Sequence, residues 1–300
     1  DEHILVPTLS IPEMDKLLEL AVLIKTKKSA NPISLLSIIS DDEEAEQNIK
    51  KTRFKLEQIV KDASATETKV NLITSIDHNV ASGIVRKTKE ILADHLILPW
   101  PEKQGLMDKF VGDKFERIIE GVNKSIFVCH FNRPMVAYKR ILIIVPPLAE
   151  HEKGFVNWLV KLNMLSKELS IPMTIYCNDA TQEAINLMHK RLEVKPSMEQ
   201  LPFDEWDDFL MLTSCVEKDD LMIVISARKG AVSYVSIFEN LSDKLEKYFT
   251  NQGRIIVYPD QFSQDHATER FPNYTAEPLQ KGIEKVQKIR KGLGSFFKKK

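Results

Sequence analysis

Short runs of apolar and β-branched residues alternate along this chain with longer segments in which apolar residues recur at helical spacing. This alternation predicts parallel β-strands joined by crossover helices. In the first half, the predicted strands are His3–Leu9, Ile33–Ile39, Lys69–Ile76, His95–Trp100 and Ser125–Phe131. Four helical segments are expected between them, so this half reads as one α/β unit.

The first two predicted helices have clear start signals. Ser10, Ile11, Pro12 and Glu13 form a capping-box pattern with proline in the first turn, and the helix is expected to continue to Ile24. The second helix is predicted from Asp41 to Lys61, with acidic residues at the positive end of its dipole. Its apolar stripe indicates that these acids form a solvated face and not a metal site.

The second half of the chain repeats the first. Ile4-Leu5-Val6-Pro7 is matched by Ile143-Ile144-Val145-Pro146, and the order of elements recurs, which indicates an internal duplication. The predicted strands are Arg140–Leu148, Pro172–Asn178, Met198–Phe203, Leu221–Ser226 and Arg254–Tyr258. The predicted helices are Glu150–Leu169, Asp179–Leu192, Asp204–Val216 and Val235–Phe249.

These patterns divide the chain into a first domain over 1–132, a linker over 133–139, a second domain over 140–262, and a tail over 263–300. The linker is short, so the two repeats are expected to pack side by side. Within the tail, 279–300 combines apolar residues at helical spacing with many lysines, which predicts a basic amphipathic helix. Such a helix could lie on an anionic membrane surface, bind an acidic protein, or serve only as a solubilising end.

The composition narrows the protein class. The chain is 43% hydrophobic and 28% charged with a net charge of −1, which argues against disorder and against nucleic-acid binding. Its three cysteines stand far apart, as expected of reduced thiols. No apolar run approaches the roughly 20 residues of a membrane-spanning helix. Because the chain starts at Asp1 without methionine or a signal-peptide pattern, we expect a fragment of a longer protein.

Motifs for catalysis are missing from the sequence. The seven histidines are scattered singly, and no P-loop, HExxH or GxSxG pattern is found. Neighbouring acids such as Asp207 and Asp208 do not converge on one substrate when they lie side by side on a helix or turn. We therefore expect no enzymatic activity.

A strand ending in Val-Pro, a long first helix, and a fourth strand followed by a glycine-bearing loop and Gly112-Asp113-Lys114-Phe115-Glu116 together resemble the universal stress protein family. The resemblance covers both repeats. It implies two doubly wound five-stranded parallel α/β sheets of strand order 3-2-1-4-5, similar to adenine nucleotide alpha hydrolases. It also implies a pseudo-dimer in which the fifth strands pair and hide their edges.

In that family, ATP is held at the carboxyl ends of strands one and four by an acidic residue and a loop of the form Gly-x-x-Gly, nine residues, Gly-Ser or Gly-Thr. Here the acidic position falls on Leu9 and Leu148. In the first loop, Pro99 and Glu102 replace two glycines, and only Gly112 matches. Because both motifs are degenerate, we expect neither ATP nor another cofactor.

Residues at the same strand ends remain candidates for a small-ligand pocket. The second loop keeps two cations that could meet an anion, and the Trp100 ring could either line a pocket or pack against the following helix. The candidate residues are Pro7, Thr8, Trp100, Gly112, Pro146, Ser226, Arg228 and Lys229.

Tandem degenerate domains of this kind resemble the cytosolic C-terminal region of bacterial monovalent cation:proton (Na⁺/H⁺ or K⁺/H⁺) antiporters. This implies a regulatory region at the cytoplasmic face of the bacterial inner membrane, with the transmembrane antiporter domain of the same polypeptide as its partner; homodimer formation stays open. One alternative is a free-standing tandem universal stress protein that binds a nucleotide or another small molecule. Another is an enzyme of the wider nucleotide-binding α/β superfamily, which would need polar groups converging at the ends of strands one and four.

Overall fold

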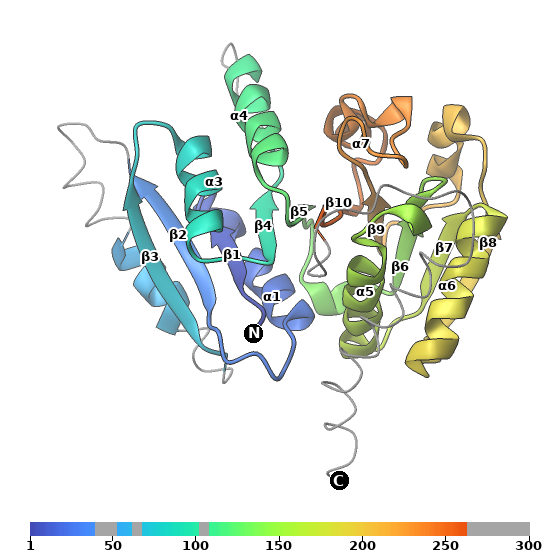
Figure 1. Cartoon of the computed structure of the whole chain (residues 1–300), viewed down its shortest axis with the longest axis horizontal. Coiled ribbons are helices and arrows are strands. Elements are labelled where there is room, and N and C mark those ends of the chain that lie inside the picture. The colour runs from blue at the N-terminus through green and yellow to red at the C-terminus, as the bar shows by residue number, and fades with distance from the viewer. Residues whose placement is uncertain (40–52, 62–67, 102–107, 263–300) are drawn as a thin grey trace, which may run out of the picture.

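The computed structural model of the protein describes residues 1–39, 53–61, 68–101 and 108–262, with only the backbone described for 108–113. Ten strands form a single sheet in the order β3-β2-β1-β4-β5-β10-β9-β6-β7-β8 (Figure 1). The strands of the first repeat are β1 Ile4–Pro7, β2 Ile33–Ile39, β3 Val70–Ile76, β4 His95–Pro99 and β5 Ser125–His130. Those of the second are β6 Arg140–Ile144, β7 Met173–Cys177, β8 Met198–Pro202, β9 Asp220–Ile225 and β10 Gly253–Tyr258. Each half has the order 3-2-1-4-5, which confirms the predicted fold class.

The two halves join through their fifth strands. β5 and β10 pair antiparallel, with Val128 opposite Ile256 and His130 opposite Arg254, whereas the other strand pairs of the sheet are parallel. This confirms the predicted pseudo-dimer. Because the pairing occupies the inner edge of each half-sheet, β3 and β8 form the two edges of the sheet in the described part of the chain.

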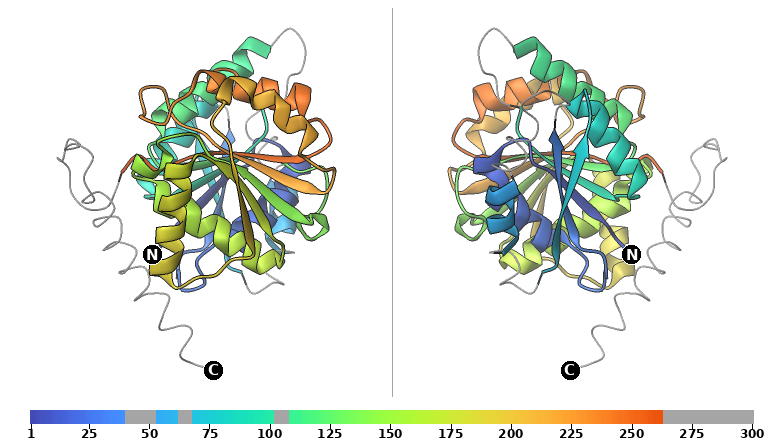
Figure 2. Two further views of the ribbon diagram at one scale, coloured as in Figure 1. Left: turned by 90° about the vertical axis from the view of Figure 1, so that its right-hand side faces the viewer. Right: turned by 90° about the vertical axis from the view of Figure 1, so that its left-hand side faces the viewer.

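Helices cover both faces of the sheet, as the two side views show (Figure 2). The apolar cluster on one face is built with α1 Met14–Ile24, α5 Phe155–Leu169 and α6 Asp179–Leu192. The cluster on the other face is built with α3 Val80–Glu90, α4 Asp108–Gly121 and α7 Leu241–Tyr248. The central strands are therefore buried on both sides and read as continuous apolar runs.

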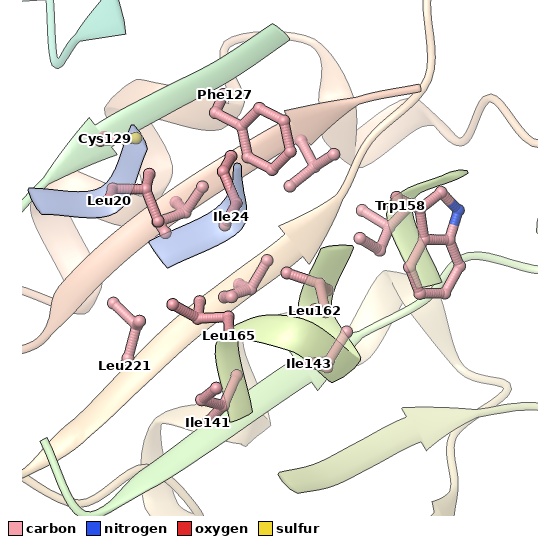
Figure 3. Packing of buried hydrophobic residues seen from close by; sticks show 14 of the residues in the cluster. Leu20, Ile24, Phe127, Cys129, Ile141, Ile143, Trp158, Leu162, Leu165 and Leu221 are labelled. Carbon is pink, nitrogen blue, oxygen red and sulfur yellow. The ribbon is translucent and has the colours of Figure 1, made fainter. Parts of the chain in front are cut away.

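One apolar core runs across the boundary between the repeats. Leu20 and Ile24 of α1 lie in the same cluster as Leu162 and Leu165 of α5, beside Phe127 of β5 (Figure 3). All five side chains are at most 1% exposed. The two repeats thus share a core as well as a sheet.

The linker packs tightly against the second repeat. Tyr138 is 2% exposed, and its hydroxyl donates a hydrogen bond to Asn132 Oδ1 at 3.0 Å. A Cβ atom added at Gly253, the first residue of β10, would lie 2.1 Å from the Tyr138 hydroxyl. Only glycine fits at this point of the junction.

Two predicted helices of the second repeat are wrong in form. Residues predicted as the helix Asp204–Val216 form a 3₁₀ helix, η5 Trp206–Ser214, with Asp208 outside helical geometry. The Trp206 and Phe209 rings stack at 5.6 Å, which suits the three-residue repeat of a 3₁₀ helix. The predicted helix Val235–Phe249 is divided into η6 Ser236–Phe238 and α7, because Asn240 between them adopts a left-handed conformation.

The predicted helix Glu150–Leu169 begins only at Phe155, after a 3₁₀ turn, η4 Ala149–His151. In the first repeat a 3₁₀ turn, η1 Ile11–Glu13, likewise precedes α1, and η3 Met135–Ala137 lies in the linker. Residues 53–61 are helical, as expected of the second helix, whereas its predicted acidic start and the basic tail 279–300 lie outside the described residues. Within the described ranges, no helix is both long and apolar enough to cross a membrane.

Candidate functional site

The carboxyl ends of β6 and β9 mark the switch point of the second repeat, where open α/β sheets bind their ligands. After β6, the chain passes through Pro146 to Leu148, which adopts a left-handed conformation with φ 65°. Leu148 occupies the position of the expected acid, and its side chain is 37% exposed. Two glutamates follow, and each accepts hydrogen bonds from another part of the repeat.

Glu150 and Glu152 bind groups of the protein itself. Glu150 Oε2 accepts a hydrogen bond from Thr181 Oγ1 (2.8 Å) at the start of α6. Glu152 Oε1 accepts two hydrogen bonds from Ser233, from its backbone N–H (3.1 Å) and from its hydroxyl (2.8 Å). A carboxylate thus already occupies two donors of the loop after β9, and its charge disfavours an incoming anion there.

Arg228 lies in the same loop and makes several hydrogen bonds to the backbone. Its side chain is buried and donates four hydrogen bonds to backbone carbonyl oxygens. The acceptors are Ile119 O (3.0 Å), Val122 O (2.6 Å), Lys124 O (2.8 Å) and Pro259 O (2.5 Å). Burial lowers the pKa of Arg228 to about 10, against the opposing effects of Asp260 and Tyr258, so the group stays charged at neutral pH.

The acceptors of Arg228 in this structure are carbonyl groups of both repeats. Three of the four carbonyl groups belong to the end of α4 and the segment before β5, in the first repeat. Since an arginine has five N–H donors, only one remains for any other acceptor. Arg228 holds the two repeats together.

Lys229 also turns toward the first repeat. Its Nζ lies 2.9 Å from Glu116 Oε1 on α4, and both side chains are largely exposed. Ser226 is buried where β9 ends. The loop after β9 therefore faces the neighbouring repeat, and both of its cations already have acceptors there.

In the first repeat the candidate residues are also tied into the fold. Pro7 is buried at the end of β1, and Thr8 donates hydrogen bonds from its N–H and its hydroxyl to Leu36 O at 2.8 and 3.2 Å. Trp100 is 7% exposed and packs in the cluster beneath α3, α4 and α7. Gly112 lies in the backbone of α4.

The eight candidates are divided between the two repeats. Two hollows of the described part of the chain lie elsewhere. One, of about 460 Å³, lies between α3 and α4 beside Val85, Arg86 and Arg117. The other, of about 450 Å³, lies beyond the end of α1 beside Lys25, Lys27 and Lys69.

A buried charge network between the repeats could not be predicted from the sequence. Lys161 of α5 is 4% exposed and forms an ion pair with Glu2, and it donates hydrogen bonds to Ile24 O (2.8 Å) and Thr26 Oγ1 (3.1 Å). His95 Nε2 lies 2.8 Å from the same Glu2 carboxylate. No local sequence signal joins these residues, because 159 positions separate Glu2 from Lys161.

The electrostatics of this network follow from its burial. Although burial alone would raise it, the hydrogen bond from His95 and the charge of Lys161 hold the pKa of Glu2 well below its usual range. Burial lowers the pKa of Lys161, with Glu2 opposing the shift. Among the described residues, no group of three or more histidine, cysteine or acidic side chains is placed to hold a metal ion.

Neither a protein-family model nor a curated protein matches this sequence. Solved structures do share its fold. The cytoplasmic domain of a prokaryotic cation chloride cotransporter matches with a TM-score of 0.58 and 12% identity, over 88% of this chain and 97% of that one. A universal stress protein from Archaeoglobus fulgidus matches with a TM-score of 0.57 and 12% identity, over 86% and 96% of the two chains.

A putative universal stress protein from Pseudomonas aeruginosa gives a TM-score of 0.52 at 8% identity, over 95% of this chain and 98% of that one. Identities this low establish the fold alone. The chain has a tandem α/β fold like that of universal stress proteins, a fold also found in the cytoplasmic domain of a transporter.

Proposed function

We propose that this protein is a non-catalytic regulatory region of a membrane cation:proton antiporter, acting at the cytoplasmic face of the bacterial inner membrane. Its partner in this proposal is the transmembrane antiporter domain of the same polypeptide. The proposal rests on one observation above all, which concerns the loop of the second repeat that would bind a triphosphate. In this loop Arg228 donates hydrogen bonds to backbone carbonyl groups, and Ser233 donates to Glu152.

Because the polar groups of the loop are hydrogen-bonded within the protein, a structural role for the loop is favoured over a catalytic one. Acid/base or phosphoryl-transfer chemistry needs groups aimed at a shared position where a substrate can sit. Here the polar groups at the ends of β6 and β9 are directed at other parts of the chain. The similarity to a transporter's cytoplasmic domain supports the choice of partner, since the likeness in fold covers 97% of that domain.

Regulation by such a unit requires that a signal bind one arrangement better than another. Because the two repeats share a sheet and a core, we expect them to move as one body relative to the membrane domain. The signal would then act on the outer surfaces of the unit, through a ligand or through contact with the membrane domain.

The test is cation-driven proton flux in inverted membrane vesicles that carry the complete gene product. We compare the wild type with Arg228→Met, which weakens the junction, and with the exposed control Lys229→Gln. The proposal predicts that transport persists in Arg228→Met with an altered dependence on pH or cation concentration, whereas the control behaves as wild type. A gene product without membrane-spanning segments contradicts the proposal.

The second candidate is a free-standing tandem universal stress protein that binds a nucleotide or another small molecule. The match to the Archaeoglobus fulgidus protein over 96% of that chain favours it as the runner-up. A gene that encodes only these two domains, together with saturable binding of AMP or ATP, would establish this candidate in place of the first.

A further inference from the structure

Arg254 is a buried arginine that forms no ion pair with an acid of the described residues. It lies at the start of β10 with 3% of its side chain exposed. Within the described part of the chain its guanidinium donates one hydrogen bond, from Nη1 to Phe249 O (2.7 Å), and its Nε is buried without an acceptor. Because an unpaired buried charge is costly, such a group calls for a counter-charge.

The opposite end of the same strand pair shows how this junction satisfies an arginine. There Arg228 donates four hydrogen bonds to carbonyl oxygens of both repeats. Arg254 lies opposite His130 at the other end of the β5–β10 ladder and has no such set of acceptors. The arginine at one end of the β5–β10 junction therefore has most of its hydrogen bonds satisfied, whereas the arginine at the other end does not.

Trp100 and His130 lie beside Arg254. Its Cζ lies 5.0 Å from the centre of the Trp100 ring, and the Trp100 and His130 ring centres are 6.5 Å apart. The indole Nε1 of Trp100 is also buried without an acceptor. Lys16 belongs to α1, which covers the other face of the sheet, and its Nζ donates a hydrogen bond to Phe131 O (2.7 Å) just beyond the end of β5.

Two cations act on His130 at this end of β5. Burial, together with the charges of Arg254 and Lys16, lowers the pKa of His130 to about 4. Glu13 lies 4.0 Å from Lys16, and Glu246 acts on Arg254 through space without a hydrogen bond. His130 is partly exposed, so solvent reaches this member of the cluster.

We propose that the carboxyl end of β5 holds a small oxyanion, inorganic phosphate or the phosphate group of a small metabolite, through Arg254, His130, Lys16 and the indole N–H of Trp100. The planar guanidinium and the indole N–H supply directed donors for oxygen, and Lys16 supplies charge. Three of these groups come from the first repeat and Arg254 from the second. A bound anion therefore stabilises the junction between the repeats.

The experiment follows the His130 imidazole signal by NMR across pH, in chloride and in phosphate at equal ionic strength. The site predicts that phosphate raises the titration midpoint by about one pH unit or more, a roughly tenfold preference for the protonated ring. The effect should saturate with phosphate concentration. An identical midpoint in both salts overturns the proposal.

Variants test the assignment of the groups. Arg254→Gln should abolish the phosphate response, whereas Arg86→Gln, an exposed arginine on α3, should leave it intact. If Arg254→Gln does not fold, Trp100→Phe keeps a ring but removes the indole N–H, and it should weaken phosphate binding. An unchanged phosphate affinity in Trp100→Phe contradicts the assigned ligand set.

Two further experiments ask whether Glu246 or a bound anion neutralises Arg254, and which anion binds. If Glu246 supplies the missing counter-charge, wild type will not respond to phosphate and Glu246→Gln will, which overturns a native anion site. If wild type responds, competition by AMP identifies a phosphate ester as ligand, and a response to inorganic phosphate alone identifies the free ion.

Discussion

At the scale of single residues, tertiary contacts decide what the cations of the second loop bind. Arg228 and Lys229 look like phosphate ligands in the sequence, because two cations follow a strand and precede a glycine. In the structure, Arg228 binds the carbonyl of Ile119, 109 positions away. A sequence pattern shows that a cation is present, but its acceptor is set by the tertiary fold, so the function of Arg228 could not be predicted.

Replacing Arg228 by methionine should destabilise the protein by about 3 kcal/mol or more, because buried carbonyl groups lose a charged donor. Urea unfolding of the complete chain measures this change. Arg228→Lys should recover only part of the loss, since an ammonium group cannot match the directed fork of a guanidinium. A stability equal to wild type in Arg228→Met would show that the four hydrogen bonds do not hold the junction.

His130 should make stability depend on pH. Its pKa is lowered from 6.5 to about 4 in the folded protein, so the unfolded chain binds the proton more readily between these values. Stability is therefore fully present above about pH 6.5 and falls as pH drops toward 4, in phosphate-free buffer. Partial exposure of the ring reduces the size of the effect.

Denaturant titrations at several pH values test this dependence. His130→Gln should remove this component and flatten the curve between pH 6.5 and 4, whereas the acid transition of the carboxylates at lower pH should remain. Equal slopes in wild type and variant would rule out His130 as the titrating group.

At the scale of elements, local signals predicted the fold well where they agree with packing. The bounds of α6 match the predicted Asp179–Leu192, because Asn178 caps the helix through its side chain, which accepts from Thr181 N at 2.9 Å. The bounds of β2 match as well. By contrast, the segment of η5 was predicted as an α-helix and forms a 3₁₀ helix. Periodicity could not reveal this, because the stacking of Trp206 on Phe209 is a tertiary effect.

Gly253→Ala tests the fit between β10 and the linker. The added Cβ would meet the Tyr138 hydroxyl at 2.1 Å, so we expect a loss of about 2–3 kcal/mol from overpacking. Gly230→Ala is a matched control, because nothing lies within 4 Å of its added Cβ and only its φ of 86° opposes alanine, which should cost about 1 kcal/mol. Thermal unfolding compares the two, and equal losses would indicate that linker packing is loose.

For the whole molecule, the continuous sheet and the shared core join the two repeats into one packed body. The sequence predicted the duplication and the pairing of the fifth strands, because repeated order and family resemblance carry that information. It did not reveal the charges buried between the repeats, such as Lys161 on Glu2, because their partners are remote in sequence. The site is thus less predictable than the fold.

Titration calorimetry with ATP tests the central claim most directly. In the second loop, Ser233 donates to Glu152 and Arg228 donates to backbone carbonyl groups, and leucine stands at the position of the acidic residue in both repeats. We therefore predict no saturable heat with micromolar ATP. Saturable binding of ATP at micromolar concentration, abolished by a substitution at the end of β6 or β9, would contradict this account.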